Sequence, residues 1–233
     1  MKKSVETVGV YLFTILGLLI CTGIYSRTAT TFAEQEKAED SFCVVIDPGH
    51  GGEDGGAVSC SGIPESTYNL DISRRINDLL NLLGYKTKMI RYDDVSIYTK
   101  GETLAQKKAS DLKERVKIVN ETSGAVLLSI HQNYFSDSQY SGAQVFYAKT
   151  KGSEQLAKKL QTEFVSKLNK GSRRQAKGIS GIYLMERINC PGILVECGFL
   201  SNPQEEALLR DSAYQKKLSS VIAVTISQYL SNT

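Results

Sequence analysis

The sequence predicts a single α/β domain with a twisted, mostly parallel sheet and helices on both faces. Short, continuous apolar runs at residues 42–46 and 125–130 have the length and composition of strands buried on both faces. Segments with helical spacing alternate with such runs along the chain, an order typical of a parallel sheet. The 233 residues, 41% of them hydrophobic, are enough for one substantial core.

Residues 1–27 are expected to form a signal peptide or a membrane anchor, and residues 28–41 a polar linker. Lys2 and Lys3 precede an uncharged run at 7–26, which is about as long as a membrane-spanning helix. Small residues at Thr31 and Ala33 offer a cleavage point. A cleaved signal and a retained anchor are both open, and either one exports the domain at 42–233.

The first elements of that domain follow from periodicity and end signals. The strand at 42–46 leads through a glycine-rich loop to a helix at 65–83, where Ile72, Ile76 and Leu80 share one face and Gly84 ends the helix. Residues 85–91 are predicted to be the next strand. Asp111 with Glu114 resembles a capping box that opens a second helix.

The second half repeats the alternation. Strands are predicted at 125–130, 143–148 and 193–196, with a helix between the last two marked by Leu156, Leu160 and Phe164. Asn202 and Pro203 begin another helix, because Pro is tolerated at the first helical position. A last helix ends near residue 230.

Charge and cysteine content exclude some classes of protein. Outside residues 1–33 the chain has 25 basic and 24 acidic residues, which does not suggest the basic stripe of a nucleic-acid-binding protein. Four cysteines in the exported part match no structural zinc pattern and are interpreted as small buried hydrophobes, although their pairing stays open. They are Cys43, Cys60, Cys190 and Cys197.

The reactive residues follow strands. His50 lies in the loop after the first strand, His131 comes directly after the strand at 125–130, and Glu196 ends the strand at 193–196. Ligand sites of open parallel sheets form beyond the carboxyl ends of the strands, so these side chains are expected at one edge. Glu65, which begins the first helix, is expected near that edge as well.

This set of residues is typical of a hydrolytic zinc site. Two imidazoles and one carboxylate, from His50, His131 and Glu65, suit one Zn²⁺ and leave a position open for water. Glu196 is then the candidate proton shuttle, and Asp47 is expected to orient the His50 ring. A phosphate-binding loop is the alternative, but residues 47–52 lack the Lys-Ser/Thr of a P-loop and the GxGxxG register.

Four motifs resemble one known family. VVIDPGHGG at 44–52, Glu65, SIHQN at 129–133 and LVECGFLSNP at 194–203 are similar to the zinc-dependent N-acetylmuramoyl-L-alanine amidases of bacterial cell-wall metabolism. The LxxR stretch at 112–115 with Asn120 is similar as well. GAQVFYAK at 142–149 and the stretch at 182–203 resemble the sporulation members, which act on spore cortex.

The resemblance implies a phosphorylase/hydrolase-like fold, with His50, Glu65 and His131 as zinc ligands and Glu196 as the catalytic carboxylate. The implied reaction is hydrolysis of the amide between N-acetylmuramic acid and L-alanine in peptidoglycan, as a step toward muramic-δ-lactam. The implied location is extracytoplasmic, in the intermembrane space around the forespore, with membrane contact if the N-terminal segment is uncleaved. An accessory regulatory protein is a further hypothesis.

Several alternatives stay open at this point. The enzyme could act on the vegetative wall as an autolysin, or could be a zinc peptidase that cuts within the stem peptide. A non-catalytic muropeptide-binding protein is disfavoured because all four residues of the site are present. Asn133 and Arg187 are candidate substrate contacts, but each could equally be a loop residue that holds the backbone.

Overall fold

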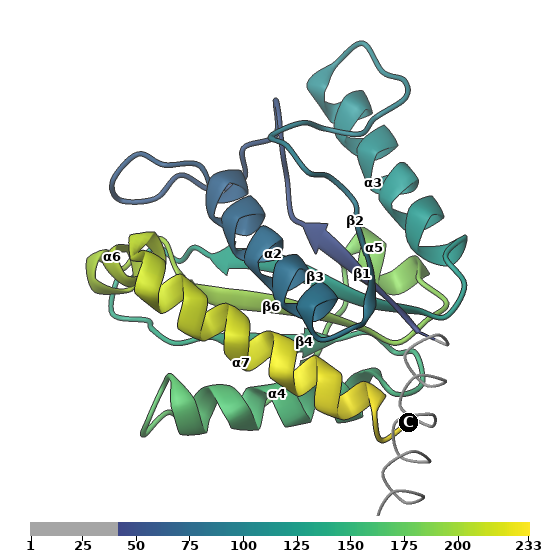
Figure 1. Cartoon of the computed structure of the whole chain (residues 1–233). Coiled ribbons are helices and arrows are strands. Elements are labelled where there is room, and N and C mark those ends of the chain that lie inside the picture. The colour runs from purple at the N-terminus through teal and green to yellow at the C-terminus, as the bar shows by residue number, and fades with distance from the viewer. Residues whose placement is uncertain (1–41) are drawn as a thin grey trace, which may run out of the picture. The chain divides into compact units, whose positions relative to one another are not determined.

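Six strands form one sheet in the order β2-β1-β3-β6-β4-β5 (Figure 1). The computed structural model describes residues 42–233, so the expected signal or anchor at 1–27 and the linker at 28–41 lie outside the described residues. The strands are β1 (Cys43–Pro48), β2 (Lys86–Met89), β3 (Ala125–Asn133), β4 (Gln144–Tyr147), β5 (Lys177–Gly178) and β6 (Gly192–Phe199). The central strands pair in parallel, as predicted, and β4 runs antiparallel to β6.

Helices cover both faces of the sheet, which confirms the predicted fold class. They are α2 (Glu65–Leu82), α3 (Leu104–Asn120), α4 (Ser153–Lys167), α5 (Tyr183–Arg187), α6 (Pro203–Arg210) and α7 (Ser212–Leu230). One face packs against α2, α4 and α7, and the other against α3 and α5 (Figure 1). Among residues 42–233, no helix is both long and apolar enough to cross a bilayer.

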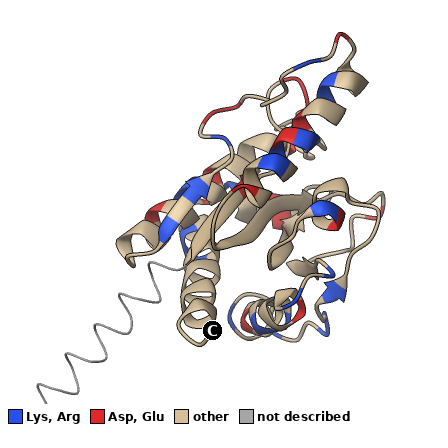
Figure 2. Cartoon of the chain, turned by 90° about the vertical axis from the view of Figure 1, so that its right-hand side faces the viewer, with Lys and Arg blue, Asp and Glu red and all other residues tan. Residues whose placement is uncertain are grey.

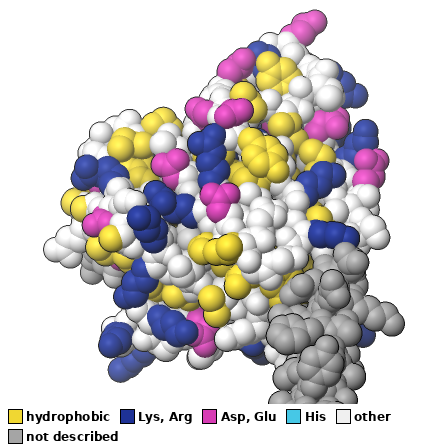
Figure 3. Space-filling model, viewed as in Figure 1, with side chains coloured by type: hydrophobic (Ala, Val, Ile, Leu, Met, Phe, Trp, Pro, Cys, Tyr) yellow, Lys and Arg dark blue, Asp and Glu magenta, His cyan; other side chains and the backbone are white. Residues whose placement is uncertain are grey.

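The two cores follow from the alternation of side chains along β1 and β3. Val44 and Ile46 belong to the core under α2 and α7, whereas Val45 faces the smaller core under α3 and α5. All three side chains are fully buried, as expected of a strand covered on both faces. The solvent side of α2, α7 and α4 is a mixed surface on which Lys and Arg alternate with acidic and apolar side chains (Figure 3).

Three details differ from the sequence prediction. The capping box of α3 lies at its true start, where Thr103 accepts a hydrogen bond from the Gln106 amide, and not at Asp111. Asp111 instead lies inside the helix and bonds the buried Arg115. The two short elements β5 and α5 have too few residues to produce a periodic signal, and they were not predicted.

The four described cysteines are free, as the sequence interpretation favoured. Cys190 and Cys197 are buried and pack as small hydrophobes. Cys60 is exposed, so the interpretation as a buried hydrophobe is wrong for that residue. Burial raises the pKa of the Cys197 thiol above its ordinary value, which keeps the thiol protonated and unreactive.

Candidate metal and catalytic site

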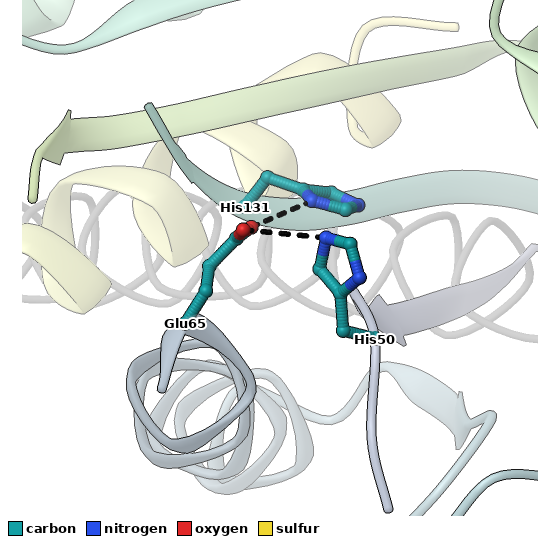
Figure 4. Close-up of side chains that lie close together, drawn as sticks. All are labelled: His50, Glu65 and His131. Carbon is teal, nitrogen blue, oxygen red and sulfur yellow. Dashed lines mark hydrogen bonds and ion pairs between the residues drawn. The ribbon is translucent and has the colours of Figure 1, made fainter. Parts of the chain in front are cut away.

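His50, Glu65 and His131 meet at the carboxyl edge of the sheet. Their ligand atoms all lie within 4.8 Å of one another (Figure 4). Glu65 lies between the two rings, with Oε2 3.2 Å from His50 Nε2 and Oε1 2.9 Å from His131 Nδ1. This is the convergence that the strand ends predict, and two imidazoles with one carboxylate form a donor set that suits Zn²⁺.

The loop after β1 allows this close approach because two glycines leave room for the ligands. A Cβ atom at Gly49 would lie 2.2 Å from His131 Cε1, and one at Gly56 would lie 2.6 Å from Glu65 Oε2. His50 itself has φ of 60°, a left-handed conformation that is unusual for a residue with a side chain. The loop therefore holds His50 in a strained backbone conformation that places its ring beside Glu65.

Two buried arginines hold this loop through its carbonyl oxygens. Arg91 donates to Pro48 O and to Gly49 O, each at 3.0 Å. Arg115 donates to Pro48 O at 3.0 Å and to His50 O at 2.8 Å. Buried carbonyls need such partners, so the arginines compensate for the hydrogen bonds that the irregular loop cannot make to itself. In the sequence, a motif indicates Arg115, but nothing indicates Arg91.

Asp54, and not Asp47, orients the His50 ring. Asp54 Oδ2 lies 3.0 Å from His50 Nδ1 and also 3.0 Å from Lys108 Nζ of α3. The hydrogen bond from His50 is the main cause that holds the pKa of Asp54 below its ordinary value. A carboxylate in this position fixes the tautomer of a metal-binding imidazole.

The expected role of Asp47 is wrong because its buried side chain bonds residues of α3 and β3 and does not contact the His50 ring. Asp47 accepts hydrogen bonds from Arg115 and, at 2.7 Å, from Ser129 Oγ. Burial favours the neutral acid, but Arg115, His131 and Ser129 outweigh it and hold the pKa of Asp47 below its ordinary value. Asp47 therefore positions Arg115, which in turn binds the loop that carries His50.

Glu196 lies beside the donor set, since it is the direct partner of His131 in the pairing of β3 with β6. Its Oε2 atom is buried and has no hydrogen-bond partner among the described residues. Burial raises the pKa of Glu196 to about 7, although His131 and His50 oppose this increase. A carboxyl group with a pKa near neutrality can both accept and release a proton at physiological pH.

A cavity of about 410 Å³ opens over these residues. His50, Glu65, His131 and Glu196 line one side, and α5 with Ile182, just before it, provides an apolar wall. The two candidate substrate contacts are not among the described residues that line it. The backbone carbonyl of Asn133 accepts a bond from Leu200, and the Arg187 guanidinium lies 3.9 Å from the centre of the Tyr183 ring. Both positions fit the alternative of residues that hold the local structure.

The site at the carboxyl edge of the sheet is of the hydrolase type. It combines the convergent donor set with an adjacent buried carboxyl group on an α/β sheet.

Comparison with known proteins identifies the family. A family model described as N-acetylmuramoyl-L-alanine amidase matches residues 44–228. The germination-specific N-acetylmuramoyl-L-alanine amidase of Bacillus subtilis (strain 168) is 40% identical over 188 residues, which are 80% of this chain and 78% of that protein.

Solved structures agree with this assignment. The CwlD amidase from Clostridioides difficile, in complex with the GerS lipoprotein, superposes with a TM-score of 0.79 at 37% identity and covers 82% of this chain and 100% of that one. The catalytic domain of CwlV from Bacillus (Paenibacillus) polymyxa var. colistinus has a TM-score of 0.68 at 30% identity, covering 81% and 98%. The chain belongs to the N-acetylmuramoyl-L-alanine amidase family. It is a cell-wall hydrolase of that class, as the motifs predicted.

Proposed function

We propose that the chain binds one Zn²⁺ through His50, Glu65 and His131 and hydrolyses the amide between N-acetylmuramic acid and L-alanine. The donor set supports zinc, because two histidines and one carboxylate are a usual ligand set of catalytic zinc and leave a position open. When bound there, the ion would lower the pKa of water and polarise the scissile carbonyl. Asp54 keeps His50 in the orientation that binding requires.

The observation that carries the proposal is the unpartnered, buried Oε2 of Glu196 beside the donor set. A buried oxygen without a partner costs free energy, and a functional role explains why it is retained. We assign Glu196 the proton transfers of the reaction. Its carboxylate takes the proton from the attacking water and then passes it to the amine that leaves, which is the amino terminus of L-alanine.

We further propose that spore cortex is the substrate and that removal of the stem peptide precedes formation of muramic-δ-lactam. The germination-specific activity in the name of the Bacillus subtilis relative supports this assignment. The complex of the Clostridioides difficile relative with a lipoprotein supports an accessory protein for this chain too. Residues 1–27 would direct export or anchor the domain, residues 28–41 would link it, and the catalytic domain at 42–233 would act outside the cytoplasm, around the forespore.

Digestion of purified peptidoglycan by the full-length chain tests these assignments. We expect mass spectrometry to find released peptides with a free L-alanine amino terminus, and faster release from cortex precursor than from vegetative wall. Fragments cut inside the stem peptide would instead identify a zinc peptidase, and preference for vegetative wall would identify an autolysin. Glu196→Gln should abolish release and keep zinc bound, whereas His131→Ala should lose both; retained activity in Glu196→Gln would refute its assigned role.

A further inference from the structure

A strongly cationic segment lies on the β4–β5 side of the sheet. Residues 149–177 contain nine Lys and Arg but only two Glu, so this segment has a net charge of +7 in a chain whose total is +3. The nearly balanced charge of the chain outside residues 1–33 conceals this concentration of positive charge. In Figure 2 the Lys and Arg positions recur around the helix seen end-on beside the C-terminal mark, which is α4.

Most of these cations have no acidic partner. Glu154 pairs with Lys158 at 2.7 Å and Glu163 pairs with Lys167 at 2.9 Å, both within α4. The two acidic residues of the segment are thereby neutralised. The remaining seven form no ion pair among the described residues: Lys149, Lys151, Lys159, Lys170, Arg173, Arg174 and Lys177. Arg174 interacts electrostatically with Glu205 of α6 without forming an ion pair, and the other six face no such carboxylate within their own segment, so the segment attracts anionic ligands.

Three of the unpaired cations line a groove of about 520 Å³. We call this groove the cationic shelf; its lining consists of Tyr140, Gln144, Arg173, Arg174, Gln175 and Lys177. The Arg174 side chain is held in place, because its Nε donates to Ser141 O at 3.0 Å and its guanidinium lies 5.1 Å from the centre of the Phe199 ring. Arg173 and Lys177 are exposed. The shelf thus combines one preorganised cation with two that can adapt to a ligand.

The shelf and the catalytic edge lie on neighbouring strands of the sheet. His131 pairs with Glu196 across β3 and β6, and Glu196 pairs with Gln144 across β6 and β4. These three residues form one row across neighbouring strands, which puts the backbone of Gln144 about 10 Å from that of His131. A long substrate that occupies the metal site would therefore have to span only a short distance over the surface to reach the shelf.

The loop that connects the two places exposes aromatic rings. Residues 134–141 run from the end of β3 to the shelf, and Tyr134, Phe135 and Tyr140 are 55%, 50% and 44% exposed. Phe135 and Tyr140 contact each other edge to face with centroids 5.0 Å apart. Exposed aromatic side chains gathered in one place mark a binding surface rather than ordinary solvent-facing positions.

We propose that the cationic shelf binds the free carboxylates of a neighbouring stem peptide on the same peptidoglycan strand, while the aromatic loop contacts its sugars. This inference rests on the proposed function and names a second contact region for its polymeric substrate. Arg173 and Arg174 line a groove that also includes Gln144, the strand partner of Glu196, and this closeness suits an extended polymer. A flat lipid surface would instead contact side chains that protrude, such as those of α4.

The test compares two double charge reversals in the full-length chain. Arg173→Glu with Lys177→Glu changes the shelf, and Lys216→Glu with Lys217→Glu changes the charge equally at exposed positions of α7. The substrates are sacculi freed of phosphate polymers and a soluble muramoyl peptide with a single stem. For the shelf variant we expect KM on sacculi to rise about ten-fold, because two exposed ionic contacts are lost. Its kcat on sacculi and its rate of hydrolysis of the soluble muramoyl peptide should not change.

Binding is measured separately from catalysis, by co-sedimentation of each variant with sacculi in a Glu196→Gln background. Weaker sedimentation of the shelf variant than of the α7 variant supports the proposal. Equal sedimentation of the two refutes it, as does a loss confined to vesicles of anionic phospholipid, which would identify a membrane contact instead. Failure of the unaltered chain to cleave either substrate would refute the proposed function, and the sedimentation result would still decide the role of the shelf.

Discussion

Replacing Glu196 by Gln should stabilise the metal-free chain above neutral pH, although it removes the proposed catalytic carboxylate. In the folded protein, burial raises the pKa of Glu196 from 4.5 to about 7. The folded state therefore retains a proton that the unfolded chain releases at lower pH. Ionisation of this buried group opposes folding, because its Oε2 atom has no partner to replace the water that it loses.

The sign and size of the effect follow from proton linkage. The contribution of Glu196 to stability is complete below about pH 4.5 and is lost as pH rises through about 7, since the folded-state pKa is raised. Each pH unit between the two pKa values corresponds to about 1.4 kcal/mol, so the full loss is about 3 kcal/mol. A glutamine has no proton to lose. The variant should thus gain about 3 kcal/mol over the natural chain by about pH 8.

Urea unfolding in the presence of a chelator, repeated from about pH 4.5 to about pH 8, measures this difference. Any cost of burying the glutamine amide is the same at every pH, so the slope of the difference is the diagnostic quantity. Glu102→Gln, at an exposed position, controls for the removal of a carboxylate. A stability difference that does not change with pH would refute the reasoning that Glu196 is buried with an unsatisfied charge.

Three further predictions concern the loop around His50. Asp54→Asn should weaken zinc binding about 10- to 100-fold by equilibrium dialysis, and saturating zinc should restore most of kcat; unchanged affinity would contradict its role in orienting His50. Gly56→Ala should reduce zinc affinity strongly, because the added Cβ would displace the Glu65 carboxylate. An unaltered zinc affinity would contradict this, since it would show that the loop can move to make room. Arg91→Met should destabilise the chain by about 2–4 kcal/mol in urea unfolding, since it removes the two buried hydrogen bonds that the guanidinium donates to Pro48 O and Gly49 O, and a loss below about 1 kcal/mol would contradict this.

The sequence was sufficient to predict the sheet edge and the residues that meet there. Strands buried on both faces leave a strong signal in continuous apolar runs, and the polar residue that ends each run identifies the carboxyl edge. His131 and Glu196 were found in this way, and their pairing across β3 and β6 bears the logic out. Residues that are far apart in the sequence therefore lie close together when they end neighbouring parallel strands.

Residues that act through loops could not be predicted in the same way. Asp54 reaches His50 because the backbone turns at His50 and Gly51, both of which have positive φ, and such a turn has no periodicity in the sequence. Arg91 follows β2, and nothing in its neighbours indicates that its side chain crosses to the loop after β1. Asp47 was assigned to the wrong partner because proximity in sequence to His50 says nothing about the face of the strand on which its side chain lies.

Unpaired buried polar atoms and a strained backbone angle, both of which cost stability, lie at the candidate site. Their location supports the assignment of the site independently of motifs. Among the described residues, three buried side-chain polar atoms have no partner, and two of them, in Gln132 and Glu196, are neighbours of His131 in the chain or across the sheet. His50, the single non-glycine residue with positive φ in the described part, lies on the other side of the same cluster. Folding alone would not concentrate such costs at one edge, whereas a site that must keep a carboxylate reactive and a ring in position would. The stability gained by Glu196→Gln is therefore expected to accompany loss of hydrolysis, since both follow from the same unpaired oxygen.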